Sequence, residues 1–185
     1  MKSRILALVI SIAVARPLLA QTPASTLKET LDWLKKYLGG AACVVFQIGR
    51  AGERLEPITE NTEVRFTDCE MILQTARTVG PKSELRTFTV PLGSLTPDSV
   101  TLSPGFEIPS GSVVAGEVPA YTMRLTAPAG LAIQASLEEF GAGAPQPTGY
   151  QTNKINILLL HTETAAELQA ALSRAITLCR QKPRF

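Results

Sequence analysis

The stretch KINILLLHTETAAELQAALSRAITLCRQKPR, from Lys154 to Arg184, carries the clearest folding signal in the chain. Its first part alternates, with Ile155, Ile157 and Leu159 on one side, which is the period of a half-buried strand. Its second part repeats apolar residues at steps of three and four, which places them on one face of an α-helix. These helical residues are Ala165, Leu168, Leu172, Ala175 and Cys179. The stretch therefore predicts a last strand that runs into an amphipathic helix.

The ends of this helix are also predicted. Thr164 and Glu167 have the spacing of a capping box, in which two side chains bind amide groups left free in the first turn. At the other end Arg180 and Lys182 suit the negative end of the helix dipole, and Pro183 discourages continuation. We therefore expect the helix to begin at Thr164 and to end near Arg180.

The first residues have the composition of a secretory signal. Lys2 and Arg4 precede an apolar run over residues 5–15, and Ala20 offers a cleavage site. The run is shorter than the ~20 apolar residues that a spanning helix needs, so we expect cleavage instead of a permanent anchor. Residues 1–20 are interpreted as a signal peptide, and the mature protein as secreted or periplasmic without an integral membrane span.

The charge of the mature chain argues against a nucleic-acid partner. The full chain holds 18 basic and 16 acidic residues, and loss of the signal removes Lys2, Arg4 and Arg16. The mature chain then has 15 basic and 16 acidic residues, a formal charge of about −1. Such a chain lacks the basic surface of DNA-binding and RNA-binding proteins. Its remaining length is typical of one domain with a single core.

Three cysteines, Cys43, Cys69 and Cys179, meet an oxidising compartment after export, so we expect one disulfide. Cys69 shares its strand face with Met71 and Leu73, and Cys179 lies on the apolar face of the last helix. Cys43 points away from the apolar side of its own strand. We therefore predict a structural Cys69–Cys179 disulfide, with Cys43 free or linking a dimer. No CxxC motif or short-spaced ligand pair supports a redox or zinc role.

A short amphipathic helix is predicted after the signal, in residues 21–40. Thr26 and Glu29 have capping-box spacing, and Gly39 with Gly40 ends the segment. Its apolar stripe consists of Leu27, Leu31, Leu34 and Leu38. We expect this stripe to pack on a sheet.

Residues 42–160 change to the period of β-structure, in which apolar and polar residues alternate. Alternation of this kind is typical of antiparallel strands with one buried face. Thr67 with Asp68 indicates a bulge or bend, and Pro128 with Gly130 a hairpin. The sequence predicts an α+β fold: an antiparallel β-barrel or sandwich of six to eight strands, capped by the C-terminal amphipathic helix.

Two segments resemble parts of a pleckstrin-homology-like domain. TFTVPLGSLTPDSVTL, residues 87–102, is similar to its strand, turn and next strand, and KINILLLHTETAAELQAALSRAITLC, residues 154–179, to its last strand and closing helix. The resemblance lies in the order of elements and implies a PH-like barrel in residues 41–185. The chain also resembles a group of secreted bacterial proteins with a TLDWL-type first helix and an ALxxAxxLC-type last helix, which brings no activity with it.

His161 is the sole histidine and follows the last predicted strand. It could act as a base for Ser136 or Thr162, but no GxSxG turn accompanies it, and a packing role at a strand end is the alternative. Glu163 and Glu167 do not form a metal-ligand set with it. We expect no catalytic, cofactor-binding or metal site.

A second candidate group is basic. Arg77, Lys82 and Arg86 lie in ARTVGPKSELR, between two predicted strands. Pleckstrin-homology domains that bind phosphoinositides use basic residues in the corresponding hairpin, so the resemblance implies a weak binding site at these residues. The alternative is a solvated hairpin. His161 is a further weak binding candidate.

These observations favour a non-enzymatic secreted or periplasmic protein that contacts another protein or an envelope component. One alternative is a carrier that holds a small apolar ligand in the mouth of the barrel. Another is a hydrolase-like enzyme of unfamiliar type that uses His161 or Cys43.

Overall fold

The computed structural model describes residues 26–108, 110–141, 147–160 and 162–182. The predicted signal peptide and His161 lie outside these residues. Over the described ranges the fold is α+β, and every strand pairing is antiparallel. None of the helices in these ranges is both long and apolar enough to span a membrane.

The elements follow one another in the order α1 (Leu27–Ala41), β1 (Cys43–Arg50), β2 (Glu56–Thr67), β3 (Glu70–Val79), β4 (Lys82–Pro91), η1 (Leu92–Ser94), η2 (Pro97–Ser99), β5 (Val100–Pro104), β6 (Ser112–Gly116), β7 (Tyr121–Thr126), β8 (Ile133–Phe140), β9 (Thr148–Thr152), β10 (Lys154–Leu159) and α2 (Thr162–Gln181).

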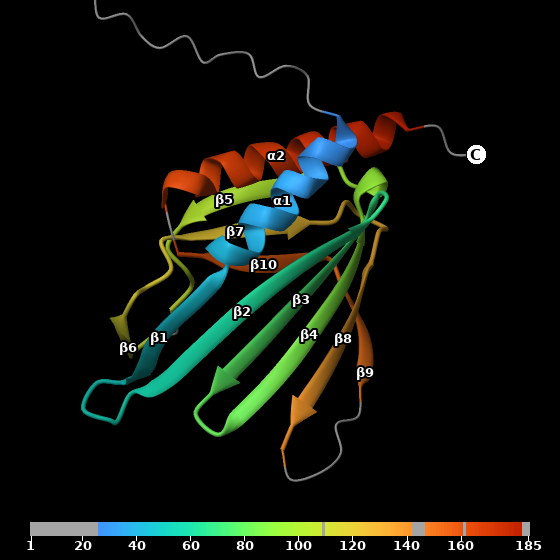
Figure 1. Cartoon of the computed structure of the whole chain (residues 1–185). Coiled ribbons are helices and arrows are strands. Elements are labelled where there is room, and N and C mark those ends of the chain that lie inside the picture. Colours follow the sequence, from blue (N-terminus) through green and yellow to red (C-terminus); the bar gives the residue numbers. More distant parts are fainter. Residues whose placement is uncertain (1–25, 109, 142–146, 161, 183–185) are drawn as a thin grey trace, which may run out of the picture.

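The strands form two sheets, and neither closes into a barrel. The large sheet has the strand order β6-β1-β2-β3-β4-β8-β9, and the small sheet has the order β10-β7-β5. Figure 1 shows both helices and the small sheet gathered at one end of the large sheet, while β2, β3, β4 and β8 extend beyond them as a fan. The predicted antiparallel architecture with a C-terminal helix is thus confirmed at the level of class.

The strand count was underestimated, because the described residues contain ten strands. Neither β6 nor β9 contains a buried residue, so both lack the alternation that identifies a half-buried strand. The bulge or bend expected at Thr67 and Asp68 is a hairpin turn, in which Thr67 pairs with Glu70 and Asp68 has a positive φ of 56°.

The predicted hairpin at Pro128 and Gly130 is wrong. A turn exists there, since the amide of Leu131 donates to the carbonyl of Pro128. However, the strands on either side of it do not pair: β7 lies between β10 and β5, and β8 lies between β4 and β9. The turn carries the chain from the small sheet to the large one.

Of the two predicted capping boxes, one is confirmed and one is wrong. At α1, the Thr26 hydroxyl accepts from the Glu29 amide at 3.3 Å, and the Glu29 carboxylate accepts from the Thr26 amide at 2.7 Å, so this capping box is confirmed. α1 continues through Gly39 and Gly40 to Ala41. At α2, the helix begins at Thr162, so Thr164 lies inside it and the predicted cap is wrong.

The predicted apolar face of α2 is confirmed and belongs to the main core. Its members Ala165, Leu168, Leu172, Ala175 and Cys179 are all buried. On the same helix Gln169 donates to the carbonyl of Val100, and Ser173 donates to that of Pro97. Hydrophobic burial and these two hydrogen bonds fix α2 against the small sheet and η2.

The predicted disulfide is also confirmed. Cys69 and Cys179 are joined, with Cα atoms 5.5 Å apart and a sequence separation of 110. The bond attaches the β2–β3 turn to the end of α2, where Lys182 also pairs with Asp68. Cys43 is free and exposed.

Candidate binding cleft

The inner face of the large sheet changes from apolar to charged along its strands, because residues two apart share a face. Close to the helices, one row across β2, β3, β4 and β8 contains four buried apolar residues. They are Val64, Leu73, Phe88 and Ala135. The next row contains Thr62, Thr75, Arg86 and Leu137, and the third contains Glu60, Arg77, Glu84 and Glu139. Beyond the helices, therefore, the sheet presents ionic side chains where the core ends.

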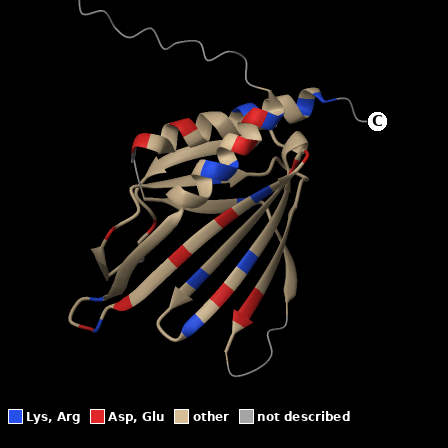
Figure 2. Cartoon of the chain, viewed as in Figure 1, with Lys and Arg blue, Asp and Glu red and all other residues tan. Residues whose placement is uncertain are grey.

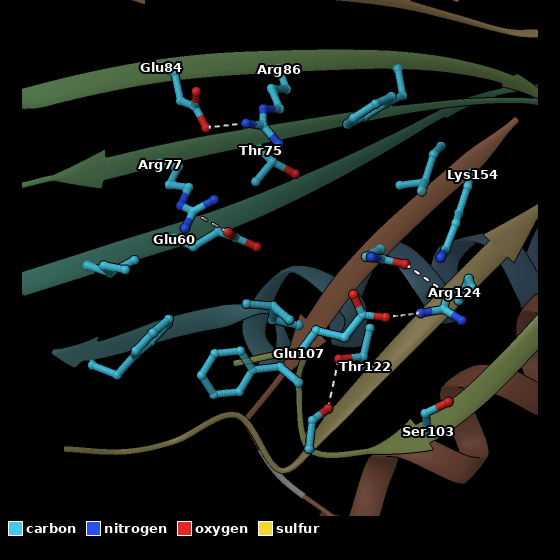
Figure 3. Close-up of a pocket in the computed structure, with 18 of the residues that line it drawn as sticks. Glu60, Thr75, Arg77, Glu84, Arg86, Ser103, Glu107, Thr122, Arg124 and Lys154 are labelled. Atoms are coloured by element: carbon cyan, nitrogen blue, oxygen red, sulfur yellow. Dashed lines mark hydrogen bonds and ion pairs between the residues drawn. The ribbon is translucent and has the colours of Figure 1, made fainter. Parts of the chain in front are cut away.

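The small sheet faces this ionic region with its own polar side. In β10, Ile155 and Ile157 point into the main core, so Lys154 and Asn156 point the other way. In β7, Thr122 and Arg124 share that orientation. Between the two sheets lies an open cleft of about 880 Å³, lined by both sets of residues. Figure 3 shows the two banks of side chains with the cleft between them.

One end of the cleft has an apolar wall. Phe46 and Ile58, on the paired strands β1 and β2, are buried in a second hydrophobic cluster, separate from the main core. Phe106 packs on Phe46 with ring centroids 5.0 Å apart, and Val79 and Leu158 also contact this cluster.

The segment after β5 brings Phe106 into the cleft. Gly105 has a φ of +68°, a conformation that side chains disfavour, so glycine permits the turn that follows Pro104. The carbonyl of Gly105 accepts from the Thr122 hydroxyl at 2.7 Å, which fixes the segment to β7.

Three ion pairs line the cleft, as Figure 3 shows. They are Glu60 with Arg77 at 3.9 Å, Glu84 with Arg86 at 2.7 Å, and Glu107 with Arg124 at 3.0 Å. Arg124 also donates to Asn156 at 3.1 Å. Lys154 makes no ion pair within the described part of the chain. Figure 2 shows acidic and basic residues interleaved along β2, β3 and β4.

The Glu60–Arg77 pair is the most deeply placed and the least well bonded. The Glu60 side chain is 11% exposed, and its pKa is raised above the ordinary value because burial penalises the charged carboxylate. Arg77 and Arg86 oppose this increase in the pKa without cancelling it. The Nε of Arg77 is buried without a hydrogen-bond partner, since 3.9 Å is too long for a hydrogen bond.

Replacing Glu60 with glutamine is expected to raise the denaturation midpoint near neutral pH. Because the pKa of folded Glu60 lies above 4.5, the folded protein binds this proton more tightly than the unfolded chain does. Stability therefore falls as the pH rises through the folded-state pKa. Glutamine does not ionise, so the difference from the wild type is expected to vanish below 4.5. Urea unfolding across a pH series measures this.

Glu63→Gln is the matched control for this experiment. Glu63 lies on the same strand but on the outer face, where it is 62% exposed and pairs with Arg65 at 3.7 Å. We expect no pH-dependent gain from this variant. An equal gain in both variants, or none in Glu60→Gln, would contradict the assigned burial effect.

The three basic candidates from the sequence lie together. Arg77 and Arg86 line the cleft, and Lys82 joins them around an adjoining hollow of about 620 Å³ at the β3–β4 hairpin.

Sequence analysis missed Glu60, although Ile58, Glu60 and Val64 lie on the same face of β2. Their alternation in EPITENTEVRFT was the signal that could have found it. Within the described residues, no group of three or more His, Cys, Asp or Glu is placed to hold a metal ion.

Neither a protein-family model, nor a curated protein, nor a solved structure matches this chain.

Proposed function

We propose that the mature chain is a secreted or periplasmic, non-enzymatic binding protein that carries a small amphipathic molecule in its cleft. The observation that carries this proposal is the lining of the cleft, which places an apolar wall directly beside an ionic floor. A volume of about 880 Å³ lies within the range of small-molecule sites. A ligand with an apolar part and a polar part matches both regions.

This proposal modifies the carrier alternative drawn from the sequence. That alternative assumed an apolar ligand, whereas seven charged side chains line the cleft. They are Glu60, Arg77, Glu84, Arg86, Glu107, Arg124 and Lys154. A purely apolar ligand would cover these groups without offering them hydrogen bonds, which is unfavourable. A polar head group avoids that cost.

Export and the pleckstrin-homology-like relationship are parts of the same proposal. The Cys69–Cys179 disulfide supports an oxidising compartment. The order of antiparallel strands followed by a C-terminal helix supports the relationship. Contact with another protein or an envelope component is compatible with a carrier, which has to receive and deliver its ligand.

The binding role is tested by titrating the purified protein with decanol, decanoate, decyl phosphate and decyltrimethylammonium in a calorimeter. We expect at least one of these single-chain amphiphiles to bind with a stoichiometry of one. Phe106→Ala is expected to weaken that binding at least about tenfold, because one buried aromatic ring contributes about 1.5 kcal/mol or more.

Tyr37→Ala is the control, because Tyr37 is an exposed aromatic residue on α1 and does not line the cleft. We expect this variant to bind as the wild type does. Absence of binding by every amphiphile, together with native mass spectra that contain only the bare protein, would refute the proposed function.

A further inference from the structure

We infer that the ligand is an acidic amphiphile, whose single anionic head group, a carboxylate or a phosphate, binds Arg77 and Arg86 on the large sheet and faces Arg124 and Lys154 across the cleft. This inference rests on the proposed function and specifies the chemical class of its ligand.

The lining of the cleft has an excess of hydrogen-bond donors. Four cationic side chains line the cleft, against three carboxylates. A guanidinium has five N–H donors and a lysine has three. Arg86 makes one short contact with Glu84, and Lys154 has no ionic partner among the described residues. The lining therefore lacks hydrogen-bond acceptors, which a ligand could supply.

Arg77 is only partly bonded within the protein. Its side chain is 34% exposed, so part of the guanidinium faces the cleft. Its buried Nε makes no hydrogen bond, and Glu60 approaches it only to 3.9 Å. Arg77 is thus held in place while some of its N–H donors still lack an acceptor. Such a residue is suited to binding an incoming anion.

The two arginines of the large sheet lie on neighbouring strands. Arg77 is directly opposite Glu84, and Arg86 is directly opposite Thr75, so the two guanidinium groups belong to adjacent rows of neighbouring strands. Planar guanidinium groups bind carboxylate and phosphate oxygens in pairs. Figure 3 shows Arg77 and Arg86 on the large sheet, with Arg124 and Lys154 on the opposite side of the cleft.

The position of the apolar wall gives the ligand an orientation. Ile58 and Val79 are paired across β2 and β3, one row beyond Glu60 and Arg77. Phe46 and Phe106 belong to the same wall. A head group at Arg77 therefore leaves the tail beside this wall, while Arg86 lies on the opposite side of the head group, toward the main core.

The test compares the four decyl amphiphiles on the wild-type protein and on Arg77→Gln/Arg86→Gln. We expect the wild type to bind decanoate and decyl phosphate at least about tenfold more tightly than decanol, since a charged hydrogen bond contributes more than 1.4 kcal/mol. Decyltrimethylammonium is expected to bind most weakly. The double variant is expected to lose the preference for anions and to keep its affinity for decanol.

Arg65→Gln is the matched control. Arg65 lies on the outer face of β2 and is 67% exposed, so its removal changes the net charge but not the cleft. This variant is expected to keep the preference for anions. The relative affinities for decanoate and decyl phosphate distinguish a carboxylate ligand from a phosphate ligand.

Equal binding of decanol and both anions would overturn the inference and leave the proposed function standing, whereas no binding at all would overturn both. An anion preference that survives in Arg77→Gln/Arg86→Gln would also overturn the inference.

If this variant does not fold, the effect of added salt on binding by the wild-type protein tests the ionic head group instead. Salt is expected to weaken decanoate binding but not decanol binding, and an equal response of the two would count against the ionic head group.

Discussion

Replacing Cys69 and Cys179 together with alanine is expected to lower the free energy of unfolding by about 2–5 kcal/mol. The disulfide closes a loop of 110 residues, for which the chain-entropy model gives about 4.7 kcal/mol. It also joins the end of α2 to the β2–β3 turn, so its loss removes the covalent link between these two segments. Urea denaturation under non-reducing conditions measures the change.

Cys43→Ala is the control for the disulfide variant. Cys43 is free and exposed on β1, so its replacement is expected to change the free energy of unfolding by less than about 0.5 kcal/mol. Peptide mapping without reductant has to find Cys69 joined to Cys179. An unchanged denaturation midpoint in the double variant, or a different pairing in the map, would contradict this arrangement.

Leu172→Ala is expected to lower the free energy of unfolding by about 3–5 kcal/mol. Leu172 lies on the apolar face of α2 and is completely buried in the main core. Its truncation removes apolar burial and leaves a cavity that the neighbouring helix and strands fill only in part. Thermal or urea unfolding followed by circular dichroism measures this loss.

Glu167→Ala provides the comparison on the same helix. Glu167 is exposed, so we expect this change to alter the free energy of unfolding by less than about 0.5 kcal/mol. Similar small effects from both variants would mean that α2 does not pack on the small sheet as described.

The features predicted correctly from sequence depend on local periodicity. The apolar face of α2 follows from steps of three and four, and these steps do not require knowledge of any partner. The parity of Cys69 with Met71, combined with that face, was enough to choose Cys179 as its disulfide partner. In the same way Thr26 and Glu29 form the cap that their spacing indicates.

The wrong hairpin at Pro128 and Gly130 concerns pairing between distant segments. β7 and β8 are consecutive strands with a turn between them, and the sequence favoured a hairpin because adjacent strands usually pair. In the structure they belong to different sheets, since β10 pairs with β7 and β9 pairs with β8. β10 comes from far along the chain, so no local pattern distinguishes this topology from a hairpin.

The cleft was predicted only in part for the same reason. Arg77 and Arg86 were identified as a basic group, but the position of Arg77 opposite both Glu60 and Glu84 depends on strand register. The facing bank depends on β10 crossing to the small sheet, which brings Lys154 to the cleft. Along β3 the inward-facing residues change from apolar to charged between Leu73 and Arg77. A change of this kind along a strand indicates where the core ends.

The most direct test of the account is chemical-shift mapping of the isotope-labelled protein during titration with decanoate. We predict that the shifted amides lie on the inner rows of β1, β2, β3 and β4 and on β7 and β10, with Phe46, Glu60, Arg77 and Arg124 among them. The outer face of β1 around Val45 is expected to remain unchanged. Shifts confined to β1 and β6, or no shifts at concentrations that saturate the calorimetric signal, would contradict a ligand site between the two sheets.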